Sequence, residues 1–121
     1  MAEGTKNTGR GNSGKGKQKP VVVSDMGRLQ PQARELEEAV LGALMLEKDA
    51  YSIISEILKP ECFYEKSHEM IYAAIVDLAA SQRPVDMLTV TEQLRKRGEL
   101  DQVGGPFYIS QLTSKVASSA H

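Results

Sequence analysis

The chain of 121 residues carries 15 basic and 16 acidic side chains, which gives a net charge of −1 at neutral pH. A chain of this length holds one domain with a modest core and leaves no room for a second, catalytic domain. Residues 1–20 carry a charge of +4 and the remaining 101 residues a charge of −5. This division argues against a fold whose whole surface binds nucleic acid, because only the N-terminal segment is basic.

The composition also argues against membrane, disulfide and metal proteins. No apolar run approaches the roughly 20 residues of a membrane span, and residues 1–20 lack the apolar stretch of a signal peptide. Cys62 is the single cysteine, so an internal disulfide is impossible, and two histidines are too few for a typical zinc site. We therefore expect a cytoplasmic protein without a metal or any other cofactor.

Residues 1–27 are predicted to form a flexible tail. Residues 4–19 contain five glycines among Lys, Asn, Ser and Thr, and this composition buries too little apolar surface to offset the entropy of ordering. The string GRGNSGKG at residues 9–16 resembles a phosphate loop, but Gly16 stands where a hydroxyl is required and no strand precedes the string. We interpret this string as a chance product of the glycine-rich composition and not as a phosphate-binding loop. Residues 21–23, three valines, are expected to be extended without a partner strand.

Residues 28–121 are predicted to form the folded domain, and its first helix covers about residues 33–47. Apolar residues recur there at three- and four-residue spacing, which is the pattern of a buried helix face. Leu41 and Met45 widen the apolar arc, which suits a helix buried on two sides, by its own domain and by a partner. The residues of the main stripe are Leu36, Val40, Ala43 and Leu44.

Three carboxylates, Glu35, Glu37 and Glu38, lie in the first turns of this helix. The helix dipole favours anions at that end. We expect all three to be charges on a solvated face and not a general acid and base pair.

A second helix is predicted between Asp49, which can cap it, and Pro60, which ends it. Its apolar face consists of Tyr51, Ile54, Ile57 and Leu58. Cys62 follows and is expected to be a small buried residue beside Phe63.

A third helix is predicted from about Lys66 to Ser81. We interpret His68, on its apolar stripe, as a half-buried histidine with a local hydrogen-bond partner, because no nucleophile or metal ligand recurs at a useful spacing. The other residues of the stripe are Ile71, Ile75 and Leu78.

A fourth helix is expected to start at Asp86 or Thr89, and Thr89 with Glu92 has the spacing of a capping box. Its apolar residues are Val90 and Leu94, and it ends at Arg95, Lys96 and Arg97 followed by Gly98.

A fifth helix is predicted from Pro106 to about residue 118, with Tyr108, Leu112 and Val116 on one face.

The predicted fold is therefore all-α, a compact bundle of about five to six short helices after a disordered tail. No active site emerges from the residues alone, so the first interpretation is a helical interaction module. The alternative is a small DNA-binding module that uses the basic tail and residues 95–97. The acidic body and the absence of a basic recognition helix argue against that alternative.

Residues 31–32, Glu35 and the segment EEAVLG at residues 37–42 resemble the opening of the N-terminal domain of DnaB-type replicative DNA helicases. That family typically reads P-P-[QH]-[NS]-x-E-x-E-x-[AS]-V-L-G there. Gln30 and Ala33 depart from the pattern, and the loss of a capping side chain at Ala33 costs about 1 kcal/mol and can shift the helix start. The resemblance continues in register over about residues 30–121, through Phe63-Tyr64, His68, Ile71, Pro84-Val85-Asp86, Leu88-Thr89-Val90, Leu94, Gly98, Leu100, Val103-Gly104-Gly105, Tyr108, Leu112 and Ser119-Ala120.

The resemblance implies a non-catalytic domain, since the family's ATPase motor, which uses ATP and Mg²⁺, would lie beyond the end of this sequence. It also implies self-association in the collar of a hexamer, docking of the C-terminal domain of primase, and contact with a helicase loader. Glu35 and Tyr108 match positions where the family couples to primase. Leu41 and Met45 are our candidates for self-association, as a weak dimer of the domain alone. Neither a membrane nor direct nucleic-acid binding is expected.

Overall fold

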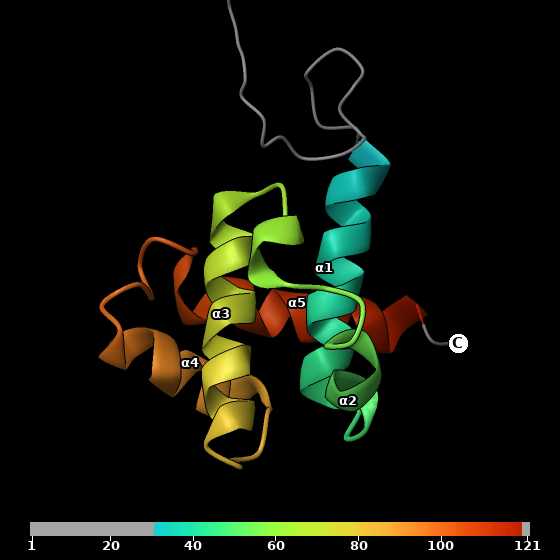
Figure 1. Ribbon diagram of the computed structural model, residues 1–121. Helices are drawn as coiled ribbons and strands as arrows, with labels where there is room; N and C mark the ends of the chain where they lie inside the picture. Colours follow the sequence, from blue (N-terminus) through green and yellow to red (C-terminus); the bar gives the residue numbers. More distant parts are fainter. Residues whose placement is uncertain (1–30, 120–121) are drawn as a thin grey trace, which may run out of the picture.

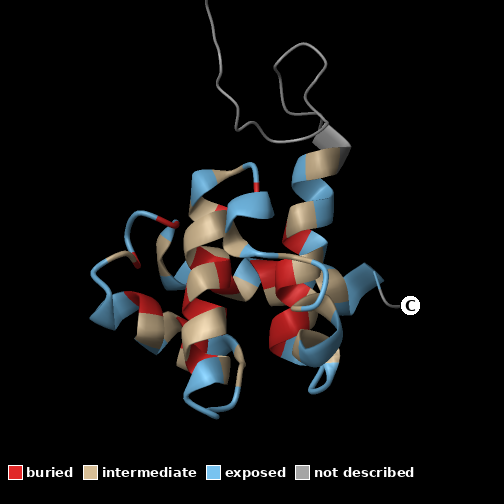
Figure 2. Ribbon diagram, viewed as in Figure 1, coloured by how far each residue is buried: buried red, intermediate tan, exposed pale blue. Residues whose placement is uncertain are grey.

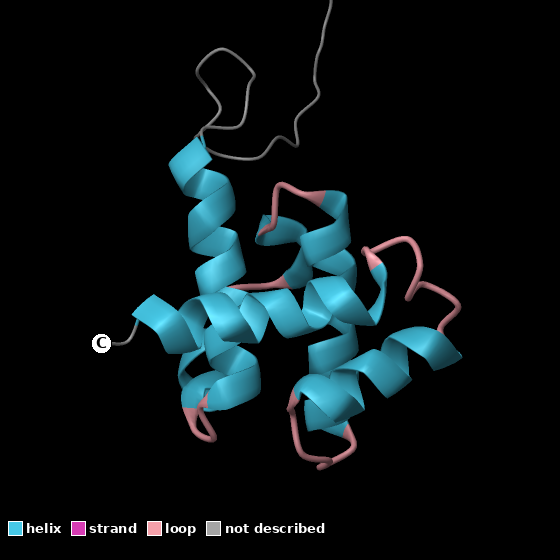
Figure 3. Ribbon diagram, turned by 180° about the vertical axis from the view of Figure 1, so that it is seen from behind, coloured by secondary structure: helices cyan, strands magenta, loops and turns pink. Residues whose placement is uncertain are grey.

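A computed structural model describes residues 31–119, which form five α-helices and one 3₁₀ helix and contain no strand (Figure 1, Figure 3). The all-α prediction is thereby confirmed for this part of the chain. The predicted tail, with its glycine-rich string and its three valines, lies outside the described residues. The elements are α1 (Pro31–Leu46), α2 (Ala50–Ile54), η3 (Pro60–Cys62), α3 (Lys66–Ala80), α4 (Met87–Lys96) and α5 (Gly105–Ser119).

Helix α5 runs across α1 (Figure 1). Gly42 of α1 lies directly against α5. A Cβ atom on Gly42 would collide with the backbone oxygen of Leu112 and would lie 2.6 Å from Cγ2 of Val116. Glycine is therefore the residue that allows this close approach of the two backbones.

The core lies among α1, α3, α4 and α5 (Figure 2). Leu41 and Met45 belong to it, with 0% and 4% of their surface exposed. The prediction that a partner completes the burial of these two side chains is wrong. Helices α2, α3, α4 and α5 all contact α1, so the domain itself buries both sides of that helix. Tyr51 and Tyr108 are half-buried and pack against the same core.

Two other predictions of burial are wrong. Leu36 is 65% exposed, because the first turns of α1 extend beyond α5 (Figure 1). Cys62 is exposed on η3. Its neighbour Phe63 is buried in the core instead, and the centroid of its ring lies 5.0 Å from that of the Tyr72 ring.

Helix α2 is shorter than predicted. Asp49 precedes it, but the Asp49 side chain makes no capping hydrogen bond. The helix ends at Ile54 because the amides of Ile57 and Leu58 both turn back to the Ile54 carbonyl, at 2.9 and 2.8 Å. Ile57 is consequently exposed and not part of a buried face.

The predicted third helix is confirmed as α3, and the apolar residues of its stripe, Ile71, Ile75 and Leu78, are buried. Helix α5 begins at Gly105, close to the predicted Pro106.

In α4, Asp86 is the N-cap, and its capping box is formed with Thr89 and not between Thr89 and Glu92. The amide of Thr89 donates to Asp86 at 2.9 Å, and the Thr89 hydroxyl accepts the Asp86 amide at 2.9 Å. The predicted apolar residues Val90 and Leu94 are buried, and Gly98 after the helix has φ 72°. The predicted C-terminus is thereby confirmed.

The basic triplet at residues 95–97 lies at the end of α4, as predicted, and carboxylates partly neutralise it. Arg95 pairs with Glu92 at 2.9 Å. Arg97 pairs with Asp77 and, at 2.9 Å, with Glu99. This pairing weakens the case for a DNA-binding surface.

None of the helices among residues 31–119 combines the length and the apolar character that a membrane span requires.

Candidate functional site

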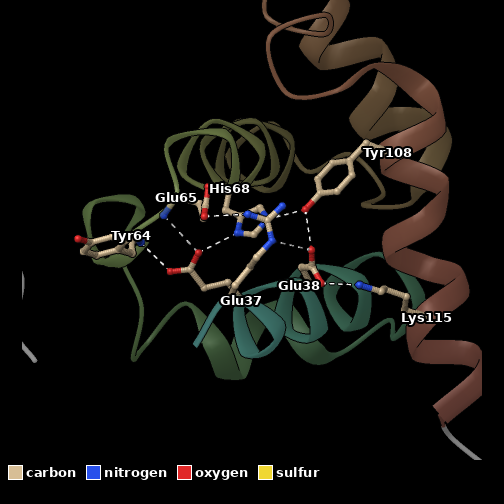
Figure 4. Close-up of polar contacts among 8 residues, drawn as sticks. Glu37, Glu38, Tyr64, Glu65, His68, Tyr108 and Lys115 are labelled. Atoms are coloured by element: carbon tan, nitrogen blue, oxygen red, sulfur yellow. Dashed lines mark hydrogen bonds and ion pairs between the residues drawn. The ribbon is translucent and has the colours of Figure 1, made fainter. Parts of the chain in front are cut away.

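Glu37 and Glu38 follow one another on α1, and their side chains reach in different directions, toward α3 and toward α5 (Figure 4). Glu37 accepts hydrogen bonds from the backbone amides of Tyr64 at 2.6 Å and Glu65 at 3.4 Å, and lies 2.7 Å from Nδ1 of His68. Burial alone would raise the pKa of Glu37, but these three hydrogen bonds outweigh it and lower the pKa below the ordinary value. Glu37 therefore joins α1 to the start of α3 as a carboxylate.

Glu38 is buried, with 6% of its surface exposed. It accepts a hydrogen bond from the Tyr108 hydroxyl at 3.1 Å and one from the Lys115 ammonium at 2.6 Å, and Nε of Arg34 lies 3.5 Å away. Burial again acts to raise the pKa, and the hydrogen bonds from Lys115 and Tyr108 together with the positive charges lower it. Glu38 therefore joins α1 to α5.

His68 links the two halves of this network (Figure 4). Its ring is fully buried, with Nε2 2.7 Å from the Tyr108 hydroxyl. The two rings are stacked at 6° with their centroids 6.0 Å apart. Burial, followed by the negative charge of Glu38, raises the pKa of Tyr108 above its ordinary value of 10. The phenol therefore keeps its proton near neutral pH.

A further ion pair reinforces the junction of α1 with the segment before α3. Nη1 of Arg34 lies 2.9 Å from Oε2 of Glu65. Side chains from α1, α3, α5 and this segment thus form one connected polar cluster, which we call the three-helix network: Arg34, Glu37, Glu38, Glu65, His68, Tyr108 and Lys115.

The structure corrects the prediction that Glu37 and Glu38 are solvated charges, because both have partners on other elements. Of that trio only Glu35 is exposed. Tyr108 is half-buried and its hydroxyl points into the three-helix network (Figure 4). His68 is more buried than predicted, and its partners are distant in sequence and not local.

Glu35 also lines a groove between α1 and the C-terminal part of α5. The groove has a volume of about 590 Å³. Glu38 and Lys115 line it as well, together with Ser114 and Ser118. The groove therefore places the predicted partner-binding carboxylate next to the edge of the three-helix network.

Sequence reasoning missed the roles of Glu37, Glu38 and Lys115. The available signal was a histidine on a buried stripe, because a buried imidazole needs polar partners. Nothing in the local pattern showed that those partners would come from α1 and α5.

The side chains of the three-helix network hold the helices in position relative to one another. Each of its two central carboxylates already accepts hydrogen bonds from several donors, so the cluster fixes how α1 packs against its neighbours. Among residues 31–119, no group of three or more His, Cys, Asp or Glu side chains is arranged to hold a metal ion.

A family model, the DnaB-like helicase N terminal domain, matches residues 29–121. The chain belongs to this family. A replicative DNA helicase DnaB of Rhodothermus marinus is 54% identical over 95 residues, which cover 78% of this chain and 10% of that protein. A replicative DNA helicase DnaC of Bacillus subtilis is 42% identical over 94 residues, which cover 78% of this chain and 21% of that protein.

The fold of this DnaB-type domain is also found in a solved structure. The crystal structure of the N-terminal domain of DnaB helicase from Mycobacterium tuberculosis matches with a TM-score of 0.65 at 40% identity. The match covers 70% of this chain and 58% of that one. The present chain therefore spans only a part of the DnaB-type proteins that it resembles.

Proposed function

We propose that this chain is the non-catalytic interaction domain of a cytoplasmic replicative DNA helicase. It docks the C-terminal domain of primase and associates with copies of itself, weakly when isolated and in the collar of the hexameric helicase. A helicase loader is a further proposed partner. The domain requires no cofactor of its own, whereas ATP and Mg²⁺ serve the motor of the whole helicase.

The observation that supports primase docking most directly is the position of Glu35 relative to Tyr108. Glu35 is exposed and lies close to one helical turn before Glu38 on α1. Glu38 in turn accepts the hydrogen bond of Tyr108. The two residues assigned to primase by resemblance are therefore connected through Glu38, although they are far apart in sequence.

The two residues would act differently on a partner. The exposed carboxylate of Glu35 suits a basic side chain of primase. The hydroxyl of Tyr108 is already bonded to His68 and Glu38, so the half-buried residue would supply mainly apolar contact.

Self-association is proposed to use apolar side chains that the fold leaves exposed. Leu41 and Met45 are unsuited to direct contact because they are buried in the core. Leu88 and Phe107 are 74% and 72% exposed and offer apolar area to a second copy.

The test of primase docking is the affinity of the Glu35→Ala variant for the C-terminal domain of the cognate primase. Glu47→Ala is the matched control, because Glu47 is an exposed glutamate directly after the same helix. We expect Glu35→Ala to weaken binding about tenfold, which corresponds to about 1.4 kcal/mol, and Glu47→Ala to leave it unchanged. Equal affinities for both variants would show that Glu35 is not part of the docking site.

A further inference from the structure

The hydrogen bonds around His68 allow the protons of the three-helix network to be counted. Nδ1 lies 2.7 Å from a Glu37 oxygen, and Nε2 lies 2.7 Å from the Tyr108 hydroxyl. The same hydroxyl lies 3.1 Å from a Glu38 oxygen. Each of these three contacts needs one proton, because two lone pairs that face each other at hydrogen-bond distance repel.

A neutral histidine leaves one contact without a proton. If the ring proton is on Nδ1, the Tyr108 hydroxyl must turn to Nε2. The contact between Tyr108 and Glu38 then has no proton. If the ring proton is on Nε2, then Nδ1 faces the Glu37 carboxylate without one. A doubly protonated ring satisfies all three contacts: Nδ1–H donates to Glu37, Nε2–H donates to Tyr108, and the Tyr108 hydroxyl donates to Glu38.

The surrounding charges place the additional proton on the ring. A proton on Glu38 would satisfy the same contacts, but Lys115 at 2.6 Å and Arg34 at 3.5 Å favour the carboxylate there. The charged groups that face His68 come from every element of the network and consist of three carboxylates and two basic side chains. They are Arg34, Glu37 and Glu38 on α1, Glu65 before α3, and Lys115 on α5, with the neutral Tyr108 between them. One positive charge on His68 makes the cluster neutral.

We propose that a doubly protonated His68 clamps α1, α3 and α5 together. In its doubly protonated form it completes a continuous chain of hydrogen bonds from Glu37 through His68 and Tyr108 to Glu38. Because Nε2–H occupies the contact with the ring, the Tyr108 hydroxyl is left to donate to Glu38 and so joins α5 to α1. This device belongs to the fold itself and does not depend on the proposed binding of primase.

The direct test is to observe the ring protons of His68 by ¹⁵N NMR. His121→Ala in the full chain leaves His68 as the single histidine, so the signals need no further assignment. We expect a directly bonded proton on both ring nitrogens, as the three contacts require. A ring that carries a single proton overturns the proposal.

Tyr108→Phe provides the matched control, because it keeps the ring and the contact of His68 with Glu37 but removes the hydroxyl that reaches Glu38. In Tyr108→Phe the Nε2–H of His68 has no acceptor, so its directly bonded proton should no longer be observed, whereas the proton on Nδ1 stays bonded to Glu37. The melting temperature of Tyr108→Phe should also be roughly 4–8 °C lower, because the hydrogen bond from α5 to α1 is lost. An unchanged Nε2 proton and an unchanged melting temperature in Tyr108→Phe would show that the chain of hydrogen bonds does not pass through Tyr108 and would overturn the clamp.

Discussion

Glu38 is the residue at which the polar contacts between α1 and α5 meet. A buried carboxylate is costly unless donors surround it, and Tyr108 and Lys115 are those donors. The Lys115 side chain is 61% exposed, so solvent screens this ion pair, and we expect the hydrogen bonds to contribute more than the charge. Glu38 therefore acts mainly as an acceptor that fixes the packing of α5.

The lowered pKa values of Glu37 and Glu38 predict sensitivity to acid. A carboxyl group whose pKa is lower in the folded chain stabilises the fold above its unfolded value, about 4.5, and this stabilisation is lost as the pH falls through the folded pKa. We expect the free energy of unfolding to decrease below about pH 4.5. Glu38→Gln cannot ionise and should lose less stability over the same acid range. Thermal melts at several pH values check this, and identical acid losses in both proteins would contradict it.

At the scale of the elements, the crossing of α1 and α5 depends on Gly42. We expect Gly42→Ala to destabilise the fold by about 1–3 kcal/mol, although alanine favours a helix more than glycine does, because the added methyl group has no space. Denaturant unfolding measures the loss.

The double variant Gly42→Ala with Val116→Ala distinguishes the collision with the Val116 side chain from the collision with the Leu112 backbone oxygen. Removing the Val116 side chain leaves the backbone oxygen of Leu112 in place, so we expect little recovery. Full recovery in the double variant would show that the helix backbones are not the limiting contact.

The sequence predicted α1, α3, α4 and α5 within a few residues, because apolar periodicity and end signals such as Gly98 are local. The resemblance to the DnaB family also singled out Glu35 and Tyr108 as candidate partner-binding residues. The exposure of Leu36 and the burial of Glu38 could not be predicted in this way. Both depend on where α5 crosses α1, and that crossing joins residues far apart in sequence. For the same reason the hydrogen bond between His68 and Glu37 was not foreseen.

At the scale of the whole molecule, the exposed Leu88 and Phe107 predict a weak dimer. Its affinity should change little with salt, because apolar contacts are not screened by ions. Analytical ultracentrifugation at low and high salt measures this. Phe107→Ser should weaken the dimer without a loss of melting temperature, because the side chain is 72% exposed. A chain that stays strictly monomeric at about millimolar concentration would contradict the prediction.

We propose that this domain binds a protein and not DNA. Calorimetric titration of the 121-residue chain with the C-terminal domain of the cognate primase and, in parallel, with a DNA oligonucleotide at two salt concentrations distinguishes the two. We predict saturable binding of primase that is reduced by Glu35→Ala, and no binding of DNA. DNA binding that weakens steeply with salt, together with no binding of primase, would contradict the account and would support the DNA-binding alternative.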